Sequence, residues 1–298
     1  MGCSSLRGLV LVKDQGALVQ LTPALDLGET SQALSKIVRP RLTIARTSPS
    51  DLTDSAQDSR DLVLVESGSR PVPISEIAEK TFVRDLTGLS PLDHVLGGGL
   101  VEASVVLLAA PPGTGKTSLT LQMLEGLGHR ALYVTGEETE VQVAATARRV
   151  GVSSSNIFVF AECDLYNIFA HAQALRAKTI AIDSIQKMAC DDVNGRAGST
   201  TQLKECTARL VKYAKQSKTA LWLIGHVTSD GDIAGPKTIE HDVDVVLELD
   251  RGPKFEGNER ILNCLSKNRF GPTGVKGHFE LTPRGFVPVD ADGWDEKL

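Results

Sequence analysis

The chain has 298 residues, a hydrophobic content of 41%, a charged content of 23% and a formal net charge of −5. This length can bury a substantial core in one or two domains, and the composition excludes a fibrous or wholly disordered protein. The mild acidity also excludes a surface that is basic throughout. A local basic channel for nucleic acid stays compatible with it, because a summed charge hides its distribution.

The cysteines and the apolar runs set further limits. None of the cysteines forms a C-x-x-C pair; they are Cys3, Cys163, Cys190, Cys206 and Cys264. This spacing predicts neither a zinc ribbon nor a disulfide framework, so we expect no bound zinc and a reducing, cytoplasmic compartment. No apolar run approaches the length of a membrane span, and no membrane partner is expected.

The first 70 residues differ from the rest of the chain. Two short apolar runs, residues 9–12 and 17–21, predict a weak β-hairpin. Residues 47–60 are rich in Ser, Asp and Thr and have little to bury, which predicts a flexible linker. We therefore expect a small N-terminal segment with a linker at 1–70 and one domain at 71–298.

A phosphate-binding loop lies between a predicted strand and a predicted helix. Residues 105–109 are apolar and β-branched enough for a buried strand, and residues 118–127 have helical spacing. The loop between them matches G-x-x-x-x-G-K-[ST] except for Ala110 at its first position. That position turns the chain and carries no charge, so alanine should be tolerated. The alternative is a chance glycine-lysine loop, and the strand before this loop and the helix after it argue against that alternative.

The loop predicts a nucleoside triphosphate site for ATP and Mg²⁺. Gly113 and Gly115 let backbone N–H groups curl around an anion, and the following helix adds the positive end of its dipole. Lys116 can reach the β- and γ-phosphates, and Thr117 can offer its hydroxyl to Mg²⁺. The predicted nucleotide-binding residues are Pro112, Gly113, Thr114, Gly115, Lys116, Thr117 and Ser118.

Strands and helices alternate after the loop. Strands are expected at residues 131–134, 157–160, 179–182 and 220–225, and helices at 141–150, 165–177 and 200–216. This pattern predicts an α/β fold with a mostly parallel sheet, helices on both faces, and ligands at the carboxyl ends of the strands. Residues 243–249, 260–266 and 277–281 have no helical spacing, and we expect antiparallel strands there at the C-terminal side.

Carboxylates follow two of the predicted strands. Asp183 can hold Mg²⁺ beside the phosphate loop, although an aspartate after a strand is often only a helix cap. Glu137 and Glu138 end another strand, where one carboxylate can polarise the water that attacks the γ-phosphorus. The alternative is a solvated acidic helix start. We rank Glu137 ahead of Glu138 as the catalytic residue.

Basic and imidazole side chains end other strands. His226 is a candidate sensor of the γ-phosphate, or a hydrogen-bonded core histidine, and position alone does not decide between these readings. Lys267 and Arg269 belong either to a charged hairpin tip or to a catalytic finger that reaches a neighbouring subunit's triphosphate. Two glycine-bearing loops, residues 191–199 and 228–240, are connectors or, in a ring, project toward the central hole.

From about Arg84 to Val289 the sequence resembles the ATPase core of the bacterial RadA/Sms DNA repair proteins, members of the RecA superfamily. The last of the matching stretches, Lys-Asn-Arg-Phe-Gly, is that family's diagnostic signature. The stretches are residues 87–100, 112–118, 133–138, 182–186, 225–228, 233–236, 240–241 and 267–271.

The resemblance implies a RecA-like core that binds single-stranded or branched DNA, forms a hexameric ring and drives branch migration with ATP, with a RecA-type recombinase as a partner. By position, Lys116 and Thr117 match the triphosphate and Mg²⁺ ligands and Asp183 the second magnesium group. Glu137 matches the catalytic glutamate. Residues 267–271 match the element that senses a neighbour's nucleotide, and the two loops match the DNA-facing loops.

Three departures from the family pattern keep alternatives open. Residues 1–70 contain only Cys3, where the family carries a four-cysteine zinc finger, and the Lon-like domain that usually follows the core is not expected here. Ser229 replaces a common lysine of the second loop. The alternatives are a DnaB-like helicase, a KaiC-like signalling ATPase, or a nucleotide-dependent regulatory module that does not remodel DNA. The signature at residues 267–271 argues against the first two.

Overall fold

The computed structural model describes residues 11–14, 17–20, 72–76, 82–226, 238–252 and 257–289. The chain divides into two units, residues 1–76 and residues 77–298. In the first unit, the two expected hairpin strands pair antiparallel and are followed by one turn of 3₁₀-helix. These elements are β1 (Leu11–Asp14), β2 (Ala17–Gln20) and η3 (Ile74–Glu76). The linker predicted at residues 47–60 lies outside the described residues.

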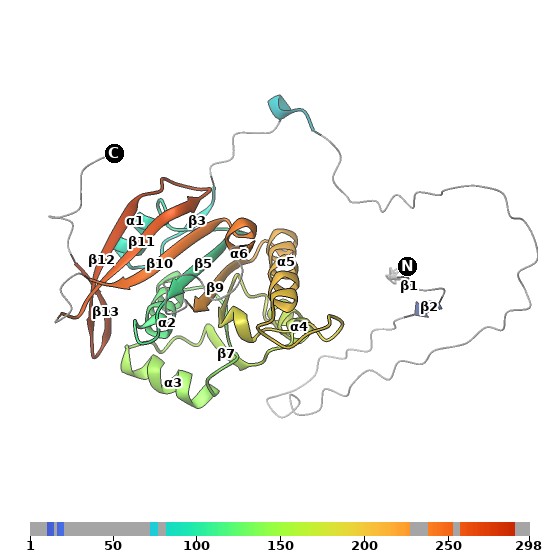
Figure 1. The fold of residues 1–298 in the computed structure, drawn as a ribbon, viewed down its shortest axis with the longest axis horizontal. Coiled ribbons are helices and arrows are strands. Elements are labelled where there is room, and N and C mark those ends of the chain that lie inside the picture. Colours follow the sequence, from blue (N-terminus) through green and yellow to red (C-terminus); the bar gives the residue numbers. More distant parts are fainter. Residues whose placement is uncertain are drawn as a thin grey trace, which may run out of the picture. The chain divides into compact units, whose positions relative to one another are not determined.

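The second unit is built on a sheet of nine strands among the described residues (Figure 1). Their order is β13-β12-β11-β10-β5-β9-β8-β6-β7. All pairings from β10 to β7 are parallel, and β11, β12 and β13 continue the sheet antiparallel. The bounds are β5 (Val105–Ala110), β6 (Ala131–Thr135), β7 (Ile157–Ala161), β8 (Thr179–Asp183), β9 (Ala220–His226), β10 (Val245–Arg251), β11 (Glu259–Asn268), β12 (Val275–Thr282) and β13 (Gly285–Pro288). A separate two-stranded ribbon pairs β3 (Arg84–Asp85) with β4 (Leu100–Val101).

One predicted strand has the opposite direction from that expected. The strand predicted at residues 243–249 is β10, and it runs parallel to β5, with Val245 opposite Val106. The antiparallel prediction was therefore wrong for this strand and is confirmed for β11 and β12. The stretch between His226 and Val245 includes a helix, α6 (Thr238–Asp242), and is long enough for the crossover that a parallel strand needs.

Helices cover both faces of the sheet, as the alternating pattern predicted. Val106 and Leu108 of β5 belong to a core shared with α1, α2 and α3, whereas Val105 and Leu107 belong to a core shared with α4 and α5. Side chains alternate between the two faces along a strand, so both faces of β5 are buried. The helices are α1 (Ser90–Val95), α2 (Lys116–Leu127), α3 (Glu140–Arg149), α4 (Leu165–Leu175) and α5 (Thr200–Ser217).

Local signals set the helix ends. Thr139 caps α3 in a reciprocal capping box with Gln142, and Asp164 caps α4 with its side chain. Gly128 ends α2 in the left-handed conformation that favours glycine, with φ 67°. These caps start α3 and α4 directly after the carboxyl ends of their strands, which is where the site is built.

Asp244 joins three elements at the amino end of the central strand. Its Oδ2 accepts hydrogen bonds from the Val105 N–H at 3.0 Å and from Lys215 Nζ at 2.6 Å. Its Oδ1 accepts one from Arg269 Nη1 at 3.1 Å, and the side chain is only 3% exposed. Through these hydrogen bonds the buried carboxylate fixes β5, α5 and the end of β11 relative to one another.

Asp244→Asn is expected to lower the free energy of unfolding by about 2–3 kcal/mol, because it removes a buried charge from two cations that stay half-exposed. Urea unfolding followed by circular dichroism measures this loss. Asp242→Asn, an exposed carboxylate on α6, is the matched control and should change stability by less than about 0.5 kcal/mol. Equal stability of the two variants would show that Asp244 is not a structural anchor.

Candidate nucleotide-binding site

The phosphate loop joins β5 to α2 and has the backbone that an anion nest requires. Gly113 and Gly115 have φ values of 76° and 99°, in the left-handed region that favours glycine. A Cβ on Gly115 would lie 2.9 Å from the Phe286 ring, so β13 packs directly against the loop. The loop is therefore held in place from the side as well as by its own strand and helix.

The predicted site residues come together at the carboxyl edge of the parallel strands. His226 at the end of β9 is opposite Ala110, where the loop begins, and Asp183 at the end of β8 is opposite Thr135 of β6. Glu137 follows β6 by two residues and reaches the same edge. The topology thus places Lys116, Thr117, Asp183, Glu137 and His226 around one site.

Lys116 is buried inside the loop. Its Nζ donates hydrogen bonds to the carbonyl oxygens of Ala110 and Pro111, both at 3.1 Å, and the residue is 8% exposed. Burial lowers the pKa of Lys116 and outweighs the opposing charges of Asp183 and Glu137. Phosphate oxygens are stronger acceptors for this cation than two carbonyls, so the amine is positioned to exchange these carbonyls for a triphosphate.

Asp183 and Thr117 bring a carboxylate and a hydroxyl together beside the phosphate loop. Thr117 Oγ1 donates to Asp183 Oδ2 at 3.1 Å, and the Tyr133 hydroxyl donates to the same oxygen at 2.7 Å. Burial, and then the charge of Asp183, raise the pKa of Tyr133 well above its usual value, so its hydroxyl stays a donor. A hydroxyl and a carboxylate beside a phosphate loop are hard oxygen ligands and fit Mg²⁺.

Glu137 is held by several donors. Its Oε1 accepts from Ser184 Oγ at 3.0 Å and lies 3.2 Å from His226 Nε2 and 4.0 Å from Lys187 Nζ. Partial burial raises the pKa of Glu137, but the Ser184 hydrogen bond and the charge of His226 outweigh it and hold the pKa below its usual value. Its carboxylate therefore stays ionised at neutral pH.

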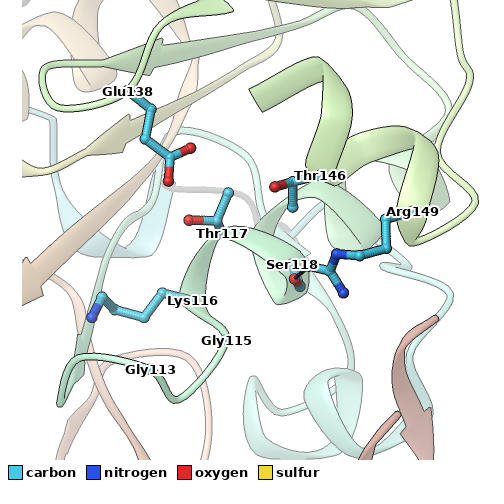
Figure 2. Close-up of a pocket in the computed structure, with 8 residues that line it drawn as sticks. All are labelled: Gly113, Gly115, Lys116, Thr117, Ser118, Glu138, Thr146 and Arg149. Atoms are coloured by element: carbon cyan, nitrogen blue, oxygen red, sulfur yellow. Dashed lines mark hydrogen bonds between the residues drawn. The ribbon is translucent and has the colours of Figure 1, made fainter. Parts of the chain in front are cut away.

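Glu138 has the opposite surroundings. Its Oε2 is buried and has no hydrogen-bond partner among the described residues. Burial, followed by the charges of Asp183 and Glu137, raises the pKa of Glu138. The two adjacent glutamates thus differ: Glu137 is oriented by donors, whereas Glu138 lines the pocket beside the loop (Figure 2).

The pocket has a volume of about 250 Å³ and opens between the loop and α3 (Figure 2). Sequence reasoning missed two of its residues, Thr146 and Arg149 of α3. A basic residue in the last turn of a helix suits the helix dipole without any ligand, so Arg149 gave no separate signal. The lining residues are Gly113, Gly115, Lys116, Thr117, Ser118, Glu138, Thr146 and Arg149.

Two further arginines beside the loop were also missed. Arg260 is buried, and its Nε donates to the Thr114 carbonyl at 3.2 Å. Arg251 is its cross-strand partner on β10 and comes near Gly113. Burial, and then the charge of Arg251, lower the pKa of Arg260. Only the β10–β11 register brings these residues to the loop, and that register is not visible in the sequence.

Comparison with known proteins supports the interpretation of this site as that of an ATPase. A model of the family described as "ATPase: KaiC" matches residues 86–159, which include the loop and Glu137. The DNA repair protein RadA of Pseudomonas aeruginosa is 42% identical over 218 residues, which are 72% of this chain and 48% of that protein. RadA of Listeria monocytogenes is 41% identical over 228 residues (74% and 48%), and RadA of Bacillus subtilis is 38% identical over 232 residues (76% and 49%).

This chain contains a RadA-family ATPase core. The resemblance seen in the motifs and the RecA-like fold class are confirmed. The chain spans about half the length of the curated relatives it matches. Within the described residues, no helix is both long and apolar enough to cross a membrane.

In the RadA-family core, Lys267 and Arg269 lie away from the chain's own nucleotide site. Lys267 is opposite Val246 on β10, which is itself opposite Leu107 in the middle of β5. Its Nζ donates to the carbonyls of Glu240 and His241 at 2.9 and 2.7 Å, at the end of α6. Arg269 pairs with Asp244 near the amino end of β5. The structure does not bring these two cations to the phosphate loop of the same chain.

Of the two loops expected to face DNA, the first is described. Asp192 in this loop pairs with both terminal nitrogens of Arg209 at 2.8 Å, and Gln202 bonds to the Cys190 and Val193 carbonyls at 3.0 and 2.7 Å. These contacts fasten the start of the loop to α5 and leave Arg196 exposed further along it. Residues 228–237 of the second loop lie outside the described residues.

Proposed function

We propose that this RadA-family core binds ATP with Mg²⁺, hydrolyses it, and uses the energy to process single-stranded or branched DNA in recombinational repair in the cytoplasm. The observation that carries the proposal is the convergence of Lys116, the Thr117–Asp183 pair and the donor-held Glu137 at one sheet edge. The DNA part is supported by relatives named DNA repair proteins.

The chain's residues have distinct roles in the proposed reaction. Lys116 and the loop amides bind the phosphates, and Thr117 and Asp183 would hold Mg²⁺, whose charge would offset that of the phosphate oxygens. Glu137 orients the attacking water and accepts its proton, while Ser184 keeps the carboxylate aimed. His226 Nε2 lies 3.2 Å from Glu137 Oε1. In this position the imidazole can contact the γ-phosphate and couple its presence to the orientation of Glu137.

The competing functions make different predictions. A KaiC-like signalling ATPase or a regulatory module needs no DNA, and a DnaB-like helicase would use DNA without the Lys-Asn-Arg-Phe-Gly signature. The matching family description includes KaiC, but the relatives that share most of this chain are RadA proteins. Nucleotide-dependent DNA binding therefore separates our proposal from the signalling and regulatory alternatives.

DNA binding is tested with a fluorescently labelled single-stranded oligonucleotide and measured by anisotropy with ATP, with ADP and without nucleotide. We expect tighter binding with ATP than with ADP, at an affinity that falls as salt rises. Arg196→Ala should weaken binding severalfold, because this exposed cation lies in the first loop. Arg148→Ala, an exposed cation on α3, is the control. If the chain binds no DNA with ATP, with ADP or without nucleotide, the proposed DNA function is wrong and the signalling or regulatory alternative is favoured.

The proposed assembly is a hexameric ring in which Lys267 and Arg269 act on the neighbouring subunit's nucleotide. Their distance from the phosphate loop of their own chain supports this role, since a catalytic cation must contact phosphate. A head-to-tail interface that closes into a ring brings such an edge to the next subunit's site. A RecA-type recombinase is the partner we propose for the ring.

Mixing two inactive variants should restore partial ATP turnover. Lys116→Ala lacks the phosphate grip, and Lys267→Ala lacks the finger. In a mixed ring, some interfaces combine the intact pocket of the second variant with the intact finger of the first. Steady-state hydrolysis, measured across mixing ratios, should rise above the sum of the separate variants and peak near equal amounts. A strictly additive mixture, or a monomer that hydrolyses at the full rate, contradicts the trans-acting role.

A further inference from the structure

Arg149 connects three elements around the pocket. Its Nη2 donates to Ser118 Oγ at 3.0 Å in the first turn of α2, and its Nη1 donates to the Pro283 carbonyl at 3.0 Å between β12 and β13. The side chain comes from the end of α3 and is exposed, although both ends of its guanidinium are tethered. Such a tether holds the guanidinium in one place beside the pocket without burying it.

The direction of a bound nucleotide follows from the loop. The lysine of a phosphate loop contacts the β- and γ-phosphates, and the first turn of the helix lies beside the α-phosphate. Lys116 and Arg149 extend on opposite sides of the Thr117–Ser118 turn (Figure 2). The phosphate chain therefore runs from Lys116 toward Ser118, and the nucleoside emerges on the Arg149 side.

The guanidinium offers a flat surface on that side. Its two hydrogen bonds run along the edge of the plane, and neither uses a face. Arginine packs its planar face on aromatic rings, and a cation held over such a ring is attracted by it. We propose that Arg149 binds the nucleoside half of the nucleotide by packing its guanidinium face on the base. This proposal rests on the proposed ATP site.

The proposal is tested by comparing two ligands that share phosphates and differ in the nucleoside. Mg²⁺-ADP and Mg²⁺-pyrophosphate are titrated calorimetrically into the full chain and its variants. In Arg149→Ala, the affinity for ADP should fall about tenfold, within the threefold to thirtyfold range of a cation on an aromatic ring. The affinity for pyrophosphate should change by less than about twofold, since the loop is untouched. Arg148→Ala, the exposed neighbour, should change neither.

Arg149→Lys distinguishes the contribution of the planar guanidinium from that of its charge. This variant also tests the proposal if Arg149→Ala does not fold. Lysine keeps the cation but has no planar group, so ADP should still bind at least about threefold more weakly. Full ADP affinity in this variant would assign Arg149 to charge attraction and overturn packing on the base. Equal losses for ADP and pyrophosphate would also overturn it, as would no loss for either. A wild-type chain that binds neither ligand would instead refute the ATP site itself.

Discussion

Lys116→Ala is expected to reduce ATP hydrolysis by about a thousandfold or more, to the limit of detection, and to weaken ATP binding. The ammonium contacts phosphates in the ground state and stabilises the charge that develops on them in the transition state. No other described residue inside the loop carries a positive charge. Phosphate release measured with excess ATP gives the rate, and calorimetry gives the affinity.

The control for this variant is its stability. Burial lowers the pKa of Lys116, which means that the fold disfavours the charged amine at this position. Removing the amine relieves this cost but also loses its hydrogen bonds to the Ala110 and Pro111 carbonyls, so the free energy of unfolding should change by less than about 1 kcal/mol. A variant that is as stable as wild type but does not hydrolyse ATP has lost only the contact between Lys116 and the phosphates. Unchanged turnover in the folded variant would contradict the enzyme assignment.

Glu137→Gln should lower hydrolysis by about a hundredfold or more and leave ATP affinity nearly unchanged. Glutamine keeps the shape and the hydrogen bond from Ser184 but cannot take the proton of the attacking water. The rate constant at saturating ATP should carry the whole loss, and the calorimetric affinity should stay within about threefold of wild type.

The matched variant is Glu138→Gln, one residue along the chain. Because burial raises the pKa of Glu138 and none of the described residues donates to its Oε2, we expect a smaller loss than for Glu137→Gln. A larger loss in Glu138→Gln would reverse our assignment of the catalytic glutamate.

The pH dependence of ATP turnover tests the direction of the Glu137 pKa shift. Since the pKa of Glu137 lies below its usual value, protonation of this group should slow turnover only under clearly acidic conditions.

Most of the site could be predicted because its signals are local. The strand, glycine turn and helix around Lys116 are contiguous in sequence, and strand ends are visible where an apolar run meets Asp183 or Glu137. Parallel strands then bring such ends to one edge whatever the details of packing. That geometric rule explains why residues as distant in sequence as Lys116 and His226 were expected at one site.

The parts that could not be predicted depend on long-range pairing. The direction of β10 follows from a crossover through α6, and an apolar run alone has no direction. Strand β13 is only four residues long and ends in proline, which an edge strand tolerates and a pattern search rejects. Arg149 and Arg260 reach the loop through tertiary contacts with Ser118 and Thr114, and nothing in their own segments indicates this.

The most direct test of a RadA-type DNA motor is ATP turnover measured with and without single-stranded DNA. We expect single-stranded DNA to raise the steady-state rate severalfold in the wild-type chain. The same DNA should have no such effect on Glu137→Gln, which controls for contaminating activity. Duplex DNA of equal length should stimulate less than the single strand. A wild-type chain that hydrolyses ATP at the same rate with no DNA, single-stranded DNA and duplex DNA would contradict the proposed function.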